Sequence, residues 1–478
     1  MSILMTKIKK ILICIYLITV SCDSESLYKH PNVIIILADD LGSSQLGCYG
    51  SSFYDTPNID KLALKGIKFN NAYSSASICS PTRAAIMTGK YPARIGLTDY
   101  IPGNFQKNKP LLTPDNWKKY LPLEEITIAE KMKSLGYKTG FFGKWHLSKE
   151  KQPPISIMHN PNMQGFSESF VTYKPTENLI QEWQIKNKDF HNVDTITKRA
   201  LDFLNQHQKS PFFLFVSHNS IHDPLIENQK TIDKYKIKDG KDKEENNSII
   251  GAMIETLDKS VGLIIKRLEE LKLIENTILI FYSDNGGKHT HASQKPFRKG
   301  KGWLYEGGIR VPLIISWPKK IKKAINSNLI ISSIDLMPTI LSVCNFDLNT
   351  GNEFDGIDFS PIFNDHTINI NREELFWHYP HYHNGSGMKP ASAIRWKNYK
   401  LIEWHESTLL KKENQIELYN LDIDPGEKNN LAGIKPDIAF EMRSKLNEWI
   451  IEVNAKMPTI NKKLKKNGIP EIVNEKLQ

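Results

Sequence analysis

One stretch dominates the sequence: Ser77-Ile-Cys79-Ser-Pro81-Thr-Arg83-Ala-Ala-Ile-Met-Thr-Gly89. Proline is favoured in the first turn of a helix, so Pro81 predicts a helix whose N-terminus lies at Cys79. Free backbone N–H groups and the helix dipole at such a terminus favour anions, and we expect them to lower the pKa of the Cys79 thiol. Arg83 follows one turn later on the same face, where its guanidinium would clamp an anion through two hydrogen bonds.

Around this stretch, short apolar runs rich in Val, Ile and Phe alternate with longer segments of helical periodicity. The pattern is typical of parallel strands buried under helices on both faces, so the sequence predicts an α/β fold. The strand candidates are Val33–Leu37, Lys138–Phe142, Phe212–Val216, Thr277–Tyr282 and Leu313–Ser316.

Signals for helices lie between these strands. Thr127-Ile-Ala-Glu130 resembles a capping box, which opens a helix that we expect to end near Gly136. Val193–Gln206 and Ser248–Leu273 have the apolar spacing of amphipathic helices. Lys230–Asn247 is rich in charge, and we expect a solvated loop there.

The chain changes character near residues 363–374, where the apolar strands thin out. Strand-like pieces at Ala393–Arg395 and Tyr399–Trp404, followed by a helix through Met442–Ile451, predict a small α+β domain. The expected organisation is a large domain at residues 30–370, a small C-terminal α+β domain at residues 371–460 and a polar tail at residues 461–478.

The first residues have the features of a targeting segment: an apolar run from Ile11 to Val20 follows Lys7, Lys9 and Lys10. The run is too short for a comfortable membrane span. Thr-Val-Ser-Cys22 resembles a bacterial lipobox, although Thr19 stands where leucine is usual, so secretion without lipid stays an alternative. We expect residues 1–22 to be a signal peptide and the protein to be exported to the periplasm or cell surface, with lipidation of Cys22 as its membrane anchor.

The 478 residues carry a formal net charge of +10, which favours anionic partners. Nucleic acid, acidic lipid and acidic glycan all fit that charge, and a lysine-rich composition explains it about as well. Cys14 and Cys22 belong to the leader and Cys79 to the quoted stretch. Cys48 and Cys344 are left, either as a pair or as small buried residues, so no disulfide framework is expected.

Polar side chains follow four of the predicted strands directly. The strands are followed, in chain order, by Asp39 and Asp40, by Lys144 and His146, by His218 and His222, and by Asp284 and Asn285. In open α/β sheets, ligands bind at the carboxyl ends of parallel strands, so these side chains are expected to converge on one site.

Four of these side chains offer hard oxygen ligands, which suit calcium or magnesium better than a soft metal: Asp39, Asp40, Asp284 and Asn285. A single pair of this kind is more often a helix cap or a turn. Two pairs at two strand ends favour a metal site. A lone histidine is usually structural, but cations and a proton carrier beside a metal suit a tetrahedral oxyanion and its leaving group; these are Lys144, His146, His222 and Lys301.

The motifs resemble those of the type I sulfatases, the formylglycine-dependent, arylsulfatase-like family of the alkaline phosphatase superfamily. The quoted stretch from Cys79 to Gly89 is similar to the family signature. Ordered matches between Asn32 and Leu431 cover most of the chain. They are Leu-Ala-Asp39-Asp40, Gly-Lys144-Trp-His146, Ser-Asp284-Asn285-Gly-Gly, Gly-Lys301-Gly-Trp-Leu-Tyr-Glu-Gly-Gly308, Leu418-Tyr-Asn-Leu-Asp422 and Asp424-Pro-Gly-Glu427.

The resemblance implies a large mixed, mostly parallel sheet flanked by helices, as in alkaline phosphatase. It also implies that a formylglycine-generating enzyme oxidises Cys79 to formylglycine (3-oxoalanine), and that the hydrated aldehyde attacks sulfur. The metal, calcium or alternatively magnesium, would be held by the modified Cys79 together with Asp39, Asp40, Asp284 and Asn285.

The resemblance further implies roles for the basic residues. Arg83, Lys144 and Lys301 would hold the sulfate oxygens, and His222 would bind the substrate and protonate the leaving group. His146 would take the proton whose loss expels sulfate. His222 matches the family pattern because a proline follows two positions later, which leaves His218 either to line the pocket or to satisfy a loop.

The expected substrate is a sulfated carbohydrate, for example an algal polysaccharide such as ulvan or a carrageenan, or a glycosaminoglycan fragment; nucleic acid is not expected. The sugar would be selected by loops outside the shared motifs, for which Tyr100–Trp117, Ser156–Lys174 and His378–Met388 are candidates. Two alternatives remain: a phosphodiesterase or phosphonate ester hydrolase on the same scaffold, and a non-catalytic glycan-binding lipoprotein.

Overall fold

The structure is a computed structural model, and it describes residues 30–104, 106, 108–149, 158–173, 189–348, 354–370 and 372–464. The expected signal peptide with Cys22 lies outside the described residues, as do residues 465–478 of the expected tail. Within the described ranges, no helix is both long and apolar enough to cross a membrane.

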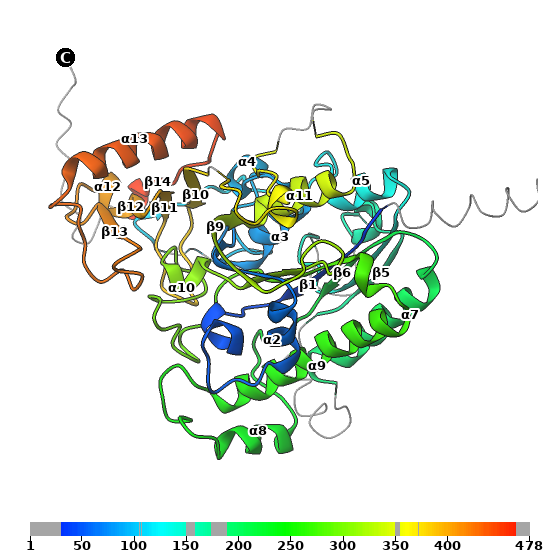
Figure 1. Cartoon of the computed structure of the whole chain (residues 1–478). Helices are drawn as coiled ribbons and strands as arrows, with labels where there is room; N and C mark the ends of the chain where they lie inside the picture. Colours follow the sequence, from blue (N-terminus) through cyan, green and yellow to red (C-terminus); the bar gives the residue numbers. More distant parts are fainter. Residues whose placement is uncertain are drawn as a thin grey trace, which may run out of the picture.

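An eight-stranded sheet forms the centre of the molecule, with strand order β5-β4-β6-β1-β7-β8-β2-β9 (Figure 1). Neighbouring strands are parallel except where β8 pairs with β7 and β2, so the sheet is mixed and mostly parallel, as expected. The strands are β1 (Asn32–Ala38), β2 (Ile67–Tyr73), β4 (Lys138–Gly143), β5 (Glu168–Val171), β6 (Phe212–Ser217), β7 (Thr277–Ser283), β8 (Leu313–Ser316) and β9 (Ile325–Ser332).

Helices cover both faces of the sheet because the central strands are apolar on both sides. In β1, Val33, Ile35 and Leu37 pack in one core, whereas Ile34 and Ile36 pack in the other. The first core is covered by α3 (Cys79–Thr88), α5 (Ile128–Ser134) and α11 (Leu336–Val343), and the second by α2 (Pro57–Leu64), α7 (Val193–His207) and α9 (Ser248–Glu270). These two sets lie above and below the sheet in Figure 1.

The five predicted strands and the predicted capping box are confirmed. Thr127 Oγ1 accepts from the Glu130 N–H at 3.2 Å, and a Glu130 carboxylate oxygen accepts from the Thr127 N–H at 2.7 Å. The loop predicted at 230–247 is partly wrong, because α8 (Gln229–Lys236) buries Ile232 and Tyr235 beside α9. Part of the loop predicted at 156–174 is likewise an edge strand, β5, paired with β4.

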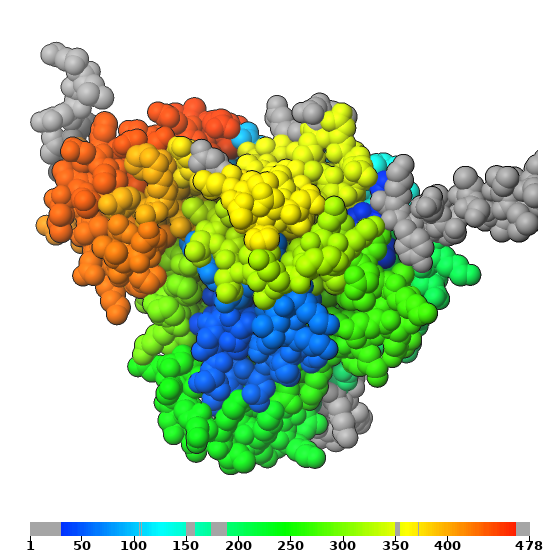
Figure 2. Space-filling model, in the orientation of Figure 1, coloured from blue at the N-terminus to red at the C-terminus, as the bar shows by residue number. Residues whose placement is uncertain are grey.

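The C-terminal region forms a second, antiparallel sheet in the order β10-β11-β12-β13, against which α13 packs. Figure 2 shows this region, orange to red, as one flank of the molecule. Its elements are β10 (Glu374–Tyr379), β11 (Ala391–Trp396), β12 (Tyr399–Trp404), α12 (His405–Leu409), β13 (Ile416–Asn420) and α13 (Pro436–Glu452). Short elements elsewhere are α4 (Pro92–Ile95), α10 (Glu306–Ile309) and β3 (Leu111–Leu112), which pairs with β14 (Thr459–Ile460).

A buried ion cluster joins the two sheets' domains. Lys400 of β12 lies 3.0 Å from a carboxylate oxygen of Glu306 and 2.7 Å from one of Glu427, and none of the three side chains is exposed. Glu427 also accepts a hydrogen bond from the backbone N–H of Glu306 at 2.7 Å. The small domain is therefore fastened to the segment that begins α10.

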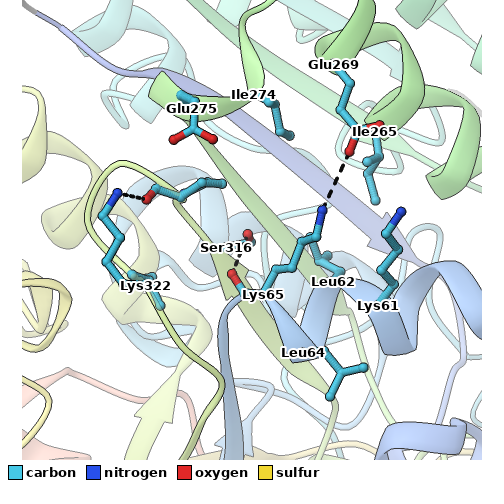
Figure 3. A pocket seen from close by; sticks show the side chains of 12 residues that line it. Lys61, Leu62, Leu64, Lys65, Ile265, Glu269, Ile274, Glu275, Ser316 and Lys322 are labelled. Carbon is cyan, nitrogen blue, oxygen red and sulfur yellow. Dashed lines mark hydrogen bonds and ion pairs between the residues drawn. The ribbon is translucent and has the colours of Figure 1, made fainter.

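A groove with a volume of about 400 Å³ opens where β7 begins, between α2, α9 and the residues after β8 (Figure 3). Lys65 lines this groove, its Nζ atom lies 3.7 Å from Glu269 Oε1, and its backbone carbonyl accepts from Ser316 Oγ. The predicted site residues follow the opposite ends of β1 and β7, so this groove is not part of their site.

Candidate active site

The strand ends converge as the sequence predicts, because β1 lies between β6 and β7 and β4 lies beside β6. The turns after these strands are hydrogen-bonded to one another. The Asp39 N–H donates to Ser220 O at 2.9 Å, and the Asp40 N–H donates to Asp284 Oδ1 at 3.2 Å. The residues that follow four separate strands therefore share one buried site.

Helix α3 brings Cys79 into this site and begins at that residue, as predicted. Cys79 Sγ lies 3.6 Å from Asp39 Oδ1 and 3.9 Å from Asp40 Oδ1, and the side chain is buried. The expectation of a lowered thiol pKa is wrong, because burial raises the pKa of Cys79 to about 12 despite the nearby charges of Lys144 and Lys301. Withdrawal from water outweighs the favourable charges and the helix terminus at this position.

The acidic residues form a set of oxygen atoms suited to a divalent cation. Ligand atoms of Asp39, Asp40, Cys79 and His222 all lie within 4.8 Å of one another. Asn285 Nδ2 donates to Asp40 Oδ1 at 2.9 Å, while the Asn285 Oδ1 atom is buried without a hydrogen-bond partner among the described residues. A buried acceptor without a donor is costly, so a cation beside Asn285 fits this set.

Two lysines pair with two of the buried carboxylates. Lys144 Nζ donates to Asp39 Oδ2 at 2.7 Å, and Lys301 Nζ lies 2.7 Å from the Asp40 carboxylate. Burial opposes ionisation of Asp40, yet Lys301, His222 and Lys144 together hold the pKa of Asp40 well below its usual range. Both lysines thus contact the acidic cluster with their ammonium groups charged.

Arg83, which is predicted to clamp an anion, contacts the acidic residues and the strand ends of the site. Its Nε donates to Asp284 Oδ2 at 2.9 Å, and its Nη2 lies 2.7 Å from the same oxygen. Its Nη1 donates to Lys144 O and to Ser217 Oγ, both at 2.7 Å. The guanidinium, which is 2% exposed, therefore holds the Asp284 carboxylate in place in this structure.

The two histidines predicted for proton transfer are both at the site. His146 Nε2 donates to Ile101 O at 2.8 Å, so its buried Nδ1 atom is the acceptor of the ring; burial, with Lys144, holds the His146 pKa well below its ordinary value. His222 Nδ1 donates to Asp223 O at 2.8 Å, and its Nε2 atom lies 3.7 Å from Asp40 Oδ2. His146 is thus anchored through Nε2 and His222 through Nδ1, so the two rings are held by different nitrogens.

The alternative left open for His218 is decided by its burial. The side chain is fully buried, its Nε2 atom lies 3.0 Å from Ser260 Oγ on α9, and burial lowers its pKa to about 3. His218 is therefore a buried residue that fastens the end of β6 to α9, and it does not line the site. Cys48 and Cys344 are also not paired, and both are free thiols.

Sequence reasoning missed an anchor of the His222 loop. Asp223 Oδ2 accepts from Lys288 Nζ at 2.6 Å, and Asp223 Oδ1 lies 2.7 Å from His291 Nε2. Both partners belong to the segment that follows Asp284 and Asn285. The only available signal was the position of Asp223 directly after the matched histidine.

Comparisons with known proteins show the family of this chain. The family described as "Sulfatase" matches residues 31–346, and the one described as "N-sulphoglucosamine sulphohydrolase, C-terminal" matches residues 298–456. A sulfatase of Formosa agariphila is 30% identical over 89% of this chain and 89% of its own, and human arylsulfatase A is 31% identical over 84% and 83%. The solved complex of Ps i-CgsB with k-i-k-neocarrahexaose has a TM-score of 0.72 and 26% identity, and the match covers 88% of this chain and 92% of that chain. The chain belongs to the sulfatase family and is a sulfuric ester hydrolase.

Proposed function

We propose that this protein is an exported sulfatase that hydrolyses sulfate esters of a sulfated carbohydrate, with formylglycine derived from Cys79 as its nucleophile. One observation carries the proposal: the Cys79 side chain lies within 4 Å of two carboxylates, to which Lys144 and Lys301 are also bound. Nucleophile, metal ligands and anion-binding cations thus meet at one point.

Sulfatases of this family use a metal ion and formylglycine. When bound, the metal would draw charge from the sulfate oxygens and lower the pKa of the attacking hydroxyl. Hydrated formylglycine offers two hydroxyls, one to attack sulfur and one to expel sulfate afterwards. The all-oxygen set of Asp39, Asp40, Asp284 and Asn285 favours calcium, with magnesium as the alternative.

The lysines have a role that follows from their contacts. A divalent cation on Asp39 and Asp40 would compete with Lys144 and Lys301 for the same carboxylate oxygens. The ammonium groups would then be available to an anion at the site and would stabilise the charge that develops on its oxygens. Arg83 would contribute through the position of Asp284, which it holds.

The histidines supply the proton transfers. A sugar alcohol is a poor leaving group and needs a proton as its bond to sulfur breaks. His222, held through its Nδ1–H, would donate that proton from Nε2. His146, held through its Nε2–H, would accept at Nδ1 the proton whose loss expels sulfate.

The carbohydrate part of the proposal draws on the relatives and on charge. One structure of similar fold was solved with the oligosaccharide k-i-k-neocarrahexaose, and the net charge of +10 favours a polyanion. We keep ulvan, carrageenan and glycosaminoglycan fragments as candidate substrates. Export with lipid on Cys22, and maturation by a formylglycine-generating enzyme, belong to the same proposal.

The test uses the full-length protein produced together with a formylglycine-generating enzyme. Mass spectrometry of the Cys79 peptide should show the aldehyde, and sulfate should be released from at least one of the candidate glycans. Cys79→Ser should fold and bind metal without turning over, because a serine sulfate ester has no second hydroxyl with which to expel sulfate. Full activity with unmodified Cys79, or faster cleavage of aryl phosphates or phosphonates than of aryl sulfates, would overturn the proposal.

A further inference from the structure

The small domain reaches the active site through the turn from His383 to Met388, which links β10 and β11. This turn packs against Gly302, the residue after Lys301. A Cβ atom on Gly302 would lie 2.5 Å from Ser386 Oγ and 2.8 Å from His383 Nδ1, and the Gly302 φ of +84° also favours glycine. The Gly302 N–H donates to Ser77 O at 2.7 Å, so the turn packs on a residue that follows Lys301 and is hydrogen-bonded two positions before Cys79.

The hydrogen bonds of His383 fix its tautomer. The backbone N–H of Ser386 donates to His383 Nδ1 at 3.1 Å, and the Ser386 hydroxyl lies 2.8 Å from the same atom. A backbone N–H can only donate, so Nδ1 carries no proton and the proton of the neutral ring is on Nε2. Burial, together with Lys301, lowers the His383 pKa to about 4, so the ring is neutral near pH 7.

The Nε2–H group of His383 is a donor that the described residues do not use. No described residue accepts a hydrogen bond from it, and the Nε2 atom is not completely buried. The charges that act on this ring are those of Lys301, Asp40 and Lys288, all of which belong to the site or its border. A fixed, neutral donor thus stands beside the sulfate-binding residues.

Tyr100 stands next to this donor and comes from the first of the loops predicted to select the sugar. Its ring centroid is 5.9 Å from that of His383 in an edge-to-face arrangement, and its side chain is about half-buried. The next residue, Ile101, is bound to the site on both sides, since its N–H donates to Ser80 Oγ and its carbonyl accepts from His146.

The two loops are also joined directly. The backbone N–H of Asn384 donates to Asn104 Oδ1 at 3.2 Å, and Gln106 Nε2 donates to Tyr382 O at 3.2 Å. The loop predicted at His378–Met388 begins with a residue that does not belong to it, because His378 lies in β10 and is buried. Only the residues after β10 are therefore available to a substrate. One wall built from two domains therefore borders the site.

We propose that His383 and Tyr100 form the subsite for the sugar ring that carries the sulfate ester. The His383 Nε2–H donates a hydrogen bond to a hydroxyl or ring oxygen, and the Tyr100 ring packs against the C–H face of the sugar. A neutral donor beside an aromatic ring suits a polar, uncharged pyranose. This assignment rests on the proposed function, because it presumes a carbohydrate sulfate.

The test compares two substrates on the formylglycine-containing enzyme. One is 4-methylumbelliferyl sulfate, whose aryl ring offers no sugar hydroxyl, and the other is the sulfated oligosaccharide that the parent enzyme cleaves best. His383→Ala should lower kcat/KM at least tenfold on the oligosaccharide and at most about threefold on the aryl sulfate, a difference of about one uncharged hydrogen bond. His383→Gln, which keeps a donor, should recover part of the loss, and the exposed His366→Ala should behave as the parent.

The outcomes separate the two proposals. If the parent releases sulfate from aryl sulfates but from no carbohydrate, the carbohydrate function fails and the subsite fails with it. If the parent cleaves carbohydrates and both His383 variants lose the same factor on the two substrates, or lose nothing, the subsite alone is overturned. Equal thermal midpoints of His383→Gln and the parent confirm that the comparison is between folded enzymes.

Discussion

Two of the buried histidines in the small domain, His378 and His405, share a hydrogen-bonded serine and should make the stability of the domain depend on pH. His378 Nε2 donates to Lys456 O at 3.0 Å, so its Nδ1 accepts from the Ser392 hydroxyl at 2.7 Å, and His405 Nε2 donates to Ser392 Oγ at 2.9 Å. These hydrogen bonds are satisfied with both imidazole rings neutral. Burial lowers the pKa of His378 to about 4, and burial with His378 and Arg443 lowers that of His405 to about 3.

The sign and size of the effect follow from these values. Both folded pKa values lie below the ordinary value of 6.5, so the unfolded chain binds more protons and stability is lost as pH falls below 6.5. At pH 5 an unfolded histidine is about 97% protonated while these two remain mostly neutral, which costs about 2 kcal/mol for each, or about 4 kcal/mol together, relative to pH 7.5.

The measurement is the urea midpoint at pH 7.5, 6.5, 5.5 and 5.0 for the parent and for the double variant His378→Gln with His405→Gln. Glutamine keeps hydrogen-bonding capacity without titrating, so the variant should start less stable at pH 7.5 and lose about 4 kcal/mol less between pH 7.5 and pH 5. The exposed His366→Gln should keep the parent's pH dependence. A double variant with the same pH dependence as the parent would refute the reasoning.

Three further predictions concern the ion cluster, the metal and the His222 anchor. Lys400→Met should lower the free energy of unfolding by about 3 to 5 kcal/mol, because Glu427 loses its paired cation and Glu306 keeps only Arg310; a loss below about 1 kcal/mol in urea titrations would contradict this. A chelator should abolish sulfate release and lower the thermal midpoint, with both restored by calcium, whereas full activity of protein that contains no divalent ion by elemental analysis would refute the metal site. Asp223→Asn should slow sugar sulfates about tenfold and aryl sulfates with good leaving groups much less, because it loosens the loop that holds His222; equal losses on both would argue against an anchoring role.

The parts of the fold that the sequence predicts are those dictated by local pattern. The continuous apolar run of β1 and the capping box at Thr127 are both read from neighbouring residues. β2 and β9 were missed because polar residues interrupt them, as in Ile67-Lys-Phe-Asn-Asn-Ala-Tyr73. The helix α8 was missed because Tyr235 lies in a segment of mostly charged residues, where its packing against α9 cannot be read from the sequence.

The site shows the same division between spacing and packing. Motif spacing predicts which residues meet, because strand ends at one edge of a sheet must converge. It does not predict that Arg83 binds Asp284, since that contact depends on how α3 packs against the strand ends. Nor does it predict the raised pKa of Cys79, which depends on how much water the surrounding domain excludes.

The burial of Cys79 also has a consequence for the order of folding and of the proposed conversion to formylglycine. Its side chain is 1% exposed, at the first residue of α3 and within 4 Å of the Asp39 and Asp40 carboxylates. Another enzyme cannot bring its own active site to an atom in that position, so the proposed oxidation of Cys79 would have to precede the packing of α3 against the sheet. We therefore expect a formylglycine-generating enzyme to modify a peptide spanning residues 77–89 and the unfolded chain, but not the folded, unmodified protein. The fraction of protein that carries formylglycine would thus depend on the rate of modification relative to the rate of folding.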